Sequence, residues 1–150
     1  MSFTDFITNH GKKVNKNAFI HLVLVSKVDG KIQKDELELL HKEGQKFGLT
    51  DPEIDTILHN EKDHNYNPPY SLEEKFEHLY NIAEMILADE FVTVSEMKMI
   101  KKFAIEAGFR YEVINDLVDI VINGVKKNED EEKLFQKFKK KLLSWLERLG

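Results

Sequence analysis

Two short acidic segments carry the residues whose type and spacing could bind a ligand. The first, Asp29 to Glu36, has the pattern D-G-x-I-x-x-x-E, which matches the second half of an EF-hand calcium loop. The first half of such a loop supplies oxygen ligands four and two residues before the aspartate, where this chain has Val25 and Lys27. The second segment, Asp89 to Glu96, has Met85 and Leu87 at these two positions and Glu90 in place of the central glycine. The sequence therefore excludes a complete EF-hand at either segment.

The closing glutamates of the two segments have a second interpretation, as helix caps. Thr93 to Glu96 has the capping-box pattern T-x-x-E, in which the glutamate accepts a hydrogen bond from the first free backbone amide. Gln33 to Glu36 has the same spacing, although glutamine is a poor N-cap residue. The spacing leaves open whether Glu36 and Glu96 bind a ligand or cap helices.

The two aspartates fit a capping role less well. Asp29 and Asp89 follow the C-terminal ends of predicted helices, where the helix dipole disfavours a negative charge. If the segments converge, Asp29, Glu36, Asp89 and Glu96 form a site that needs a hard divalent cation to relieve its repulsion. We expect calcium, magnesium or zinc at such a site, with the two aspartates as the main ligands.

The elements that carry these segments form an internal repeat. Residues 27–49 (KVDGKIQKDELELLHKEGQKFGL) align without gaps with residues 87–109 (LADEFVTVSEMKMIKKFAIEAGF). The offset is 60 residues throughout (89 − 29, 96 − 36 and 108 − 48), and it superimposes acids, apolar positions and the closing glycine. The alignment predicts two similar halves that are related by a pseudo-twofold axis.

Helix signals predict an all-α fold. The segment 18–25 (AFIHLVLV) is rich in β-branched residues, but its counterpart from Phe76 to Asp89 has helical spacing, so we predict helices at both. In each half a second helix follows the acidic segment, and a third begins near Asp51 or Arg110. The breaker-rich stretch from Asn60 to Tyr70 separates the halves.

The expected architecture is a compact helical bundle in a single domain over residues 1–150. It contains two three-helix repeats, at about 15–60 and 71–124, a short N-terminal helix, and a long amphipathic helix at about 129–149. Three glycines that follow apolar-periodic stretches are predicted to end helices: Gly48, Gly108 and Gly124.

Composition narrows the class of protein. The chain has no cysteine, which excludes disulfides, thiolate nucleophiles and cysteine-ligated zinc. Its net charge of −5 argues against nucleic-acid binding. The sequence contains no signal peptide, no membrane-spanning stretch and none of the motifs H-E-x-x-H, G-x-S-x-G or P-loop. We therefore expect a cytoplasmic protein that is not an enzyme and has no organic cofactor and no small-molecule substrate.

The C-terminal helix offers a second candidate surface. Its apolar residues fall on one stripe and its lysines cluster around the polar side: Leu134, Phe138, Leu142, Trp145 and Leu149, and Lys133, Lys137, Lys139, Lys140 and Lys141. Such a helix could lie on an anionic membrane or in the groove of a partner protein. It could also close the domain's own core with its lysines in water, and this is the arrangement that we expect.

The acidic segments also indicate a family. The run SKVDGKIQKDELELL from Ser26 to Leu40, repeated as LADEFVTVSEMKMI from Leu87 to Ile100, resembles the TerB-like domain of tellurite-resistance proteins. That domain also occurs in a membrane-tethered J-domain co-chaperone. The resemblance covers the chain from about Ala18 to Gly124.

The resemblance implies an all-helical fold with pseudo-twofold repeats and no established catalytic activity. It also implies an acidic metal site, which falls on Asp29, Glu36, Asp89 and Glu96 in this chain. Glu90 in place of glycine departs from the pattern of the first repeat. The basic C-terminal helix has no counterpart in the family pattern.

Together these features favour a non-enzymatic stress-response module of the tellurite or metal resistance type. It would bind a divalent cation, a partner protein or both through the acidic site between the repeats, membrane-associated partners included. The alternative is a metal-independent scaffold or co-chaperone-like domain that uses the basic C-terminal helix. A hydrolase that uses paired carboxylates is least favoured, because no nucleophile or general base accompanies them.

Overall fold

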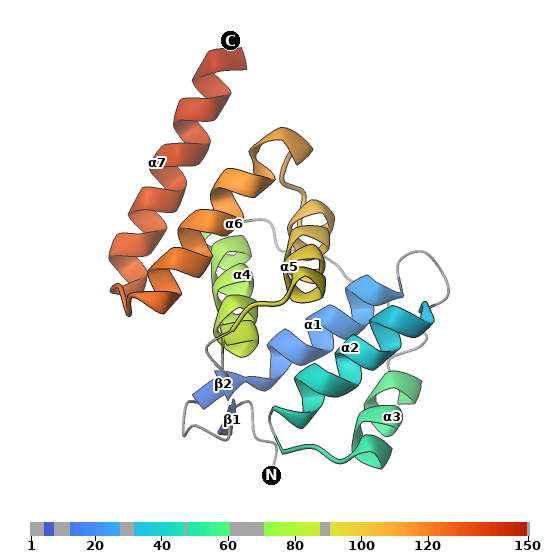
Figure 1. The fold of residues 1–150 in the computed structure, drawn as a ribbon. Coiled ribbons are helices and arrows are strands. Elements are labelled where there is room, and N and C mark those ends of the chain that lie inside the picture. Colours follow the sequence, from blue (N-terminus) through green and yellow to red (C-terminus); the bar gives the residue numbers. More distant parts are fainter. Residues whose placement is uncertain are drawn as a thin grey trace.

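The computed structural model describes residues 5–7, 13–27, 32–46, 48–60, 71–87 and 91–149. Within these ranges the fold is helical, as predicted, with seven helices and one two-stranded hairpin (Figure 1). The elements in chain order are β1 (Asp5–Ile7), β2 (Lys13–Asn15), α1 (Lys16–Ser26), α2 (Lys34–Gln45), α3 (Asp51–Asn60), α4 (Leu72–Ile86), α5 (Val94–Glu106), α6 (Tyr111–Lys126) and α7 (Glu131–Leu149). No helix in the described ranges is long and apolar enough to cross a bilayer.

The N-terminal segment forms the hairpin and not the short helix that the sequence predicts. β1 pairs antiparallel with β2, with Phe6 opposite Val14. The residues between the strands include Asn9 and Gly11, which favour turns and leave too few residues on either side for a stable helix. Aromatic and β-branched residues at paired positions favour strands. The prediction of a short N-terminal helix was therefore wrong.

α4 lies at the centre of the bundle. It packs against α1, α5, α6 and α7. The buried apolar side chains form one cluster, whose largest members come from four different helices: Phe19, Phe76, Phe103 and Phe138. The third helices of the two halves differ in position, since α6 packs against α4 and α5, whereas α3 lies at the edge of the molecule against α2 (Figure 1).

Two glycines follow the ends of helices, and a third lets a neighbouring helix pack closely against its own helix. Gly48 and Gly108 follow α2 and α5 with φ angles of 84° and 100°, a left-handed conformation that favours glycine, as predicted. Gly124 lies inside α6, where a Cβ atom would come within 2.4 Å of Leu134 Cδ1 of α7. The residue with positive φ after α6 is Asn128. The prediction that Gly124 ends its helix was wrong, because its small size is needed for the packing of α7.

The two halves of α7 have different surroundings. Leu134 and Phe138 in the first half are buried in the core. Leu143 and Leu146 in the second half are about half exposed. Figure 1 shows the start of α7 beside α6 and its C-terminal end farther from the bundle. The first half therefore closes the core, as predicted, while the second half leaves apolar surface in contact with solvent.

Candidate functional site

The structure places two of the four predicted acids. Glu36 lies in the first turn of α2, and Glu96 lies in the first turn of α5. Asp29 and Asp89 lie outside the described residues. Among the residues that are described, no group of three or more His, Cys, Asp or Glu side chains could hold a metal ion. The described residues by themselves therefore supply no cation site of three or more such ligands.

Both glutamates form capping boxes. Glu96 Oε1 accepts a hydrogen bond from the Thr93 backbone amide at 3.0 Å, and Thr93 Oγ1 accepts one from the Glu96 amide at 3.0 Å. Glu36 Oε1 accepts a hydrogen bond from the Gln33 backbone amide at 3.4 Å. The longer distance agrees with the weak N-cap preference of glutamine. Each glutamate thus uses one oxygen to begin its helix.

The two glutamates also form ion pairs between α2 and α5 that follow the 60-residue offset. Lys102 Nζ lies 3.1 Å from Glu36 Oε2, and Lys42 Nζ lies 3.9 Å from Glu96 Oε1. Adding 60 to 36 and to 42 gives 96 and 102, so each glutamate faces the equivalent lysine of the other helix. The start of α2 therefore lies beside the second half of α5, and the start of α5 lies beside the second half of α2. The two helices therefore run in opposite directions across this contact.

This geometry keeps the two glutamates apart. Glu36 and Lys42 are six residues apart on α2, which is about 9 Å along the helix axis. Because Lys42 faces Glu96, the two carboxylates lie at opposite ends of the contact. Oxygen ligands lie within about 2.6 Å of a bound calcium ion. The described part of the chain does not bring Glu36 and Glu96 to a common point.

Glu96 also belongs to a buried charged cluster that the sequence analysis missed. Lys46 Nζ donates to Glu96 Oε2 at 2.6 Å and to the Ile86 carbonyl oxygen at 2.9 Å, and it lies 3.2 Å from Glu43 Oε1. Glu43 and Glu96 are fully buried, and Lys46 is 8% exposed. One sequence signal could have revealed the cluster, since Glu43 occupies the place of the buried Phe103 in the second half.

The two buried glutamates differ in protonation state. Burial raises the pKa of Glu43 to about 9, and its hydrogen bond with Glu96 adds to this effect. The nearby Lys46 ammonium group, 3.2 Å from Glu43 Oε1, acts in the opposite direction, but the effect of burial is larger and favours the neutral acid, which can donate a hydrogen bond to Glu96. Burial alone would raise the pKa of Glu96 too, but hydrogen bonds from Glu43, Lys46 and the Thr93 amide outweigh it and hold that pKa at about 2. At neutral pH the cluster therefore has no net charge.

Lys46 contacts the end of α4 and the start of α5. Ile86 is the last residue of α4, and Glu96 lies in the first turn of α5. The carbonyl groups at the C-terminal end of a helix carry partial negative charge and attract an ammonium group. One buried lysine thereby joins the two helix ends that flank residues 87–93.

A cleft of about 370 Å³ opens between α2, α5 and the end of α1. Leu39 and Met99, which are equivalent by the offset (99 − 39 = 60), both line it, and the other α2 residues of its wall come from the start of that helix. Its other lining residues combine apolar, polar and charged side chains: Val25, Ser26, Gln33, Asp35, Glu36, Ser95, Lys98 and Lys102. Apolar walls with charges of both signs can hold an apolar side chain whose neighbours are polar.

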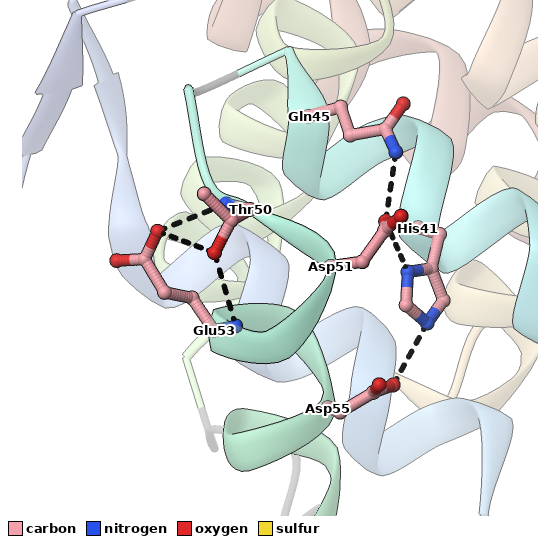
Figure 2. A network of polar contacts seen from close by, with 6 residues as sticks. All are labelled: His41, Gln45, Thr50, Asp51, Glu53 and Asp55. Atoms are coloured by element: carbon pink, nitrogen blue, oxygen red, sulfur yellow. Dashed lines mark hydrogen bonds and ion pairs between the residues drawn. The ribbon is translucent and has the colours of Figure 1, made fainter.

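A polar network attaches α3 to α2 (Figure 2). His41 Nδ1 lies 2.8 Å from Asp51 Oδ1, and His41 Nε2 lies 2.9 Å from Asp55 Oδ1. Gln45 Nε2 donates to Asp51 Oδ1 at 2.8 Å. Each ring nitrogen of His41 thus has a carboxylate of α3 as its partner. The arrangement is a helix-to-helix contact.

Comparisons of the chain with models of protein families, with curated proteins and with solved structures found no match. The resemblance to the TerB-like domain therefore rests on the two acidic segments and their 60-residue offset. We infer function from the geometry of the α2–α5 junction.

Replacing Lys46 by methionine should destabilise the protein by about 3–5 kcal/mol, because the Glu96 carboxylate would stay buried without its ammonium partner. Urea unfolding at neutral pH, followed by circular dichroism, measures the change. Lys42→Met is the matched control, since Lys42 is 44% exposed and lies 3.9 Å from the same carboxylate. The free energy of unfolding of the control should fall by less than about 1 kcal/mol. Equal losses in the two variants would contradict the buried ion pair.

The raised pKa of Glu43 should make stability fall as pH rises. The carboxyl group titrates near 4.5 when exposed and near 9 in the folded protein, so between these values only the folded state holds the proton. The free energy of unfolding should then decrease by up to about 1.4 kcal/mol per pH unit. Glu43→Gln, which keeps a hydrogen-bond donor toward Glu96, should remove this dependence.

Urea unfolding at pH 5, 7 and 8.5 tests the prediction. Glu43→Gln should match the parent protein at the lowest pH and exceed its stability at the highest. Glu38→Gln, an exposed position on α2, is the control and should follow the parent. A Glu43→Gln curve that runs parallel to the parent curve would show that Glu43 is ionised.

Proposed function

We propose that this chain is a non-enzymatic, cytoplasmic stress-response module of the TerB-like type, related to tellurite or metal resistance. It binds a partner protein at the α2–α5 junction, and a divalent cation at its acidic segments supports that site. One observation carries the proposal. Phe91 and Val94, which precede the cleft-lining Ser95 in the chain, are 77% and 74% exposed. A single domain of two pseudo-twofold-related repeats presents this surface.

Repeated contacts support the two-repeat arrangement. The glutamate caps and the glutamate–lysine pairs occur twice at the same offset, and α1 packs against its counterpart α4. Antiparallel contact between α2 and α5 is the geometry that a twofold axis between them would produce. The different positions of α3 and α6 limit the symmetry to the first two helices of each repeat.

The exposed pair has the properties of a protein-binding anchor. Aromatic side chains presented on a rigid support often dominate the affinity of protein interfaces. The support here is the buried Lys46 cluster, which holds the end of α4 and the start of α5. By the 60-residue offset, Phe91 and Val94 correspond to Lys31 and Lys34 in the first half. The exposed apolar pair is therefore specific to the second half. That contrast was visible in the sequence.

The sequence also gives the chemistry expected of the partner. Asp89 and Glu90 directly precede Phe91 in the sequence. A partner segment with an apolar side chain and basic neighbours would complement this combination, membrane-associated partners included.

The cation belongs to the proposal through Asp29 and Asp89. Glu36 and Glu96 already have lysine partners and cap their helices. The aspartates are therefore the proposed ligands, and the glutamates keep the helices that flank them in place. Calcium, magnesium and zinc are the candidate ions. Binding would stabilise the native state by mass action.

The exposed apolar residues in the second half of α7 support a different candidate. Leu143 and Leu146 could serve a metal-independent scaffold or co-chaperone-like domain whose contact surface is the basic C-terminal helix. Deleting the helix would not test this role, because Leu134 and Phe138 belong to the core. Substitutions of the two exposed leucines are the appropriate variants.

The partner proposal predicts that Phe91→Ser/Val94→Ser abolishes partner capture without a loss of stability. Immobilised protein is exposed to a lysate of the source cells, and bound proteins are quantified by mass spectrometry against each variant. Tyr111→Ser is the matched control, because Tyr111 is a similarly exposed aromatic residue at the start of α6. Proteins retained by the parent and the control but lost with the double variant support the site. Loss with Leu143→Ser/Leu146→Ser instead would favour the C-terminal helix.

The cation proposal predicts saturable binding to metal-stripped protein. Calorimetric titrations with calcium, magnesium, manganese and zinc should give a signal that Asp29→Asn/Asp89→Asn removes while circular dichroism stays unchanged. Glu73→Gln/Glu77→Gln is the matched control, since it removes the same charge from exposed positions on α4. Absence of binding to the parent protein, or equal binding to all variants, would leave the aspartates without a metal role.

A further inference from the structure

A second groove, of about 300 Å³, lies between the latter half of α7, the start of α4 and the turn between α5 and α6. Its walls are five apolar side chains: Leu72, Phe109, Leu142, Trp145 and Leu146. The volume is at the lower end of the range of small-molecule sites, roughly 300 to 1,000 Å³. The groove shares no lining residue with the α2–α5 cleft, so it is independent of the proposed function.

Two cations stand over the aromatic rings of this groove. Lys75 Nζ lies 5.8 Å from the centre of the Phe109 ring, and the Arg110 guanidinium lies 6.0 Å from the centre of the Trp145 ring. In the described part of the chain, neither cation forms an ion pair and no carboxylate lines the groove. The chain has 27 acidic and 22 basic residues, so basic side chains have many possible partners elsewhere. This groove is selectively positive.

The start of α6 adds to the positive potential. Arg110 is the N-cap residue of this 16-residue helix, and its side chain makes no capping hydrogen bond. The N-terminal end of a helix carries partial positive charge. A negatively charged group beside Arg110 would therefore interact with two side-chain cations and with the helix dipole.

We propose that this groove binds a medium-chain aliphatic carboxylate, of the fatty-acid type, as a ligand and not as a substrate. Its hydrocarbon chain lies along the leucine and aromatic walls, and its carboxylate binds Lys75 and Arg110. The planar guanidinium can donate two parallel hydrogen bonds to a carboxylate. Among the described residues that line the groove, only Lys75 and Arg110 are charged, and Trp145 adds a single indole N–H, so most hydroxyl groups of a sugar or nucleotide would lie unpaired against apolar walls.

Trp145 is the only tryptophan of the chain, so its fluorescence reports directly on this groove. The full-length protein is titrated with sodium decanoate below its micelle concentration, and calorimetry measures the stoichiometry. We expect a saturable change in emission with one equivalent bound. Decanol and decylammonium have the same chain without the negative charge, and each should bind at least about tenfold more weakly.

Variants locate the site. Lys75→Gln/Arg110→Gln should weaken decanoate binding by about tenfold or more, and Leu146→Glu should abolish it by placing a carboxylate in the groove. Lys139→Gln/Lys140→Gln is the matched control, because it removes two exposed cations of α7 that do not line the groove, and it should bind as the parent does. No saturable response to decanoate, equal affinity for decanol or decylammonium, or parental affinity in Lys75→Gln/Arg110→Gln would each overturn the proposal.

Discussion

The Lys46 ammonium group is the contact on which the junction of α2, α4 and α5 depends. Removing a charge from water is unfavourable by several kcal/mol, roughly, unless partners replace its hydration. Lys46 has such partners in the Glu96 carboxylate and the Ile86 carbonyl group. The neutral form of Glu43 completes the cluster without adding a second negative charge. Ile86 ends α4 and Glu96 lies in the first turn of α5. The lysine that stabilises the core therefore also holds the two helix ends between which the exposed Phe91 lies, with the exposed Val94 at the start of α5.

Charge at the α2–α5 junction is largely balanced within the protein. Glu36 faces Lys102, and Glu96 faces Lys42 and Lys46. A glutamate that caps a helix and pairs with a lysine has few lone pairs left for a metal ion, which is why the aspartates are the better candidate ligands. The balance also changes the character of the cleft. Its lining is apolar with charges of both signs, which suits a side chain of a partner protein better than a bare cation.

The surface of α7 follows from how deeply each part of it is buried. Gly124 lets the start of the helix approach α6, where Leu134 and Phe138 complete the core. Farther along, the helix leaves a groove beside Phe109. There the cations Lys75 and Arg110 lie over aromatic rings, and no carboxylate of the described residues pairs with them. An amphipathic helix can thus combine a structural role at one end with a binding surface at the other, although its sequence pattern is continuous.

The sequence by itself determined the features that arise from neighbouring residues. Helical periodicity identified the helices, the glycines at 48 and 108 identified two helix ends, and the spacing of Thr93 and Glu96 allowed a capping box. The sequence wrongly predicted a short N-terminal helix where Phe6 and Val14 pair in a hairpin. Pairing between two strands depends on residues that are apart in the chain, so local periodicity does not reveal it. Tertiary structure alone decided that Lys46 and Glu96, 50 residues apart, share a buried contact. It also placed Glu36 and Glu96 at opposite ends of the contact between α2 and α5. Burial determines which charges are neutralised and which remain available, and burial depends on residues distant in the chain.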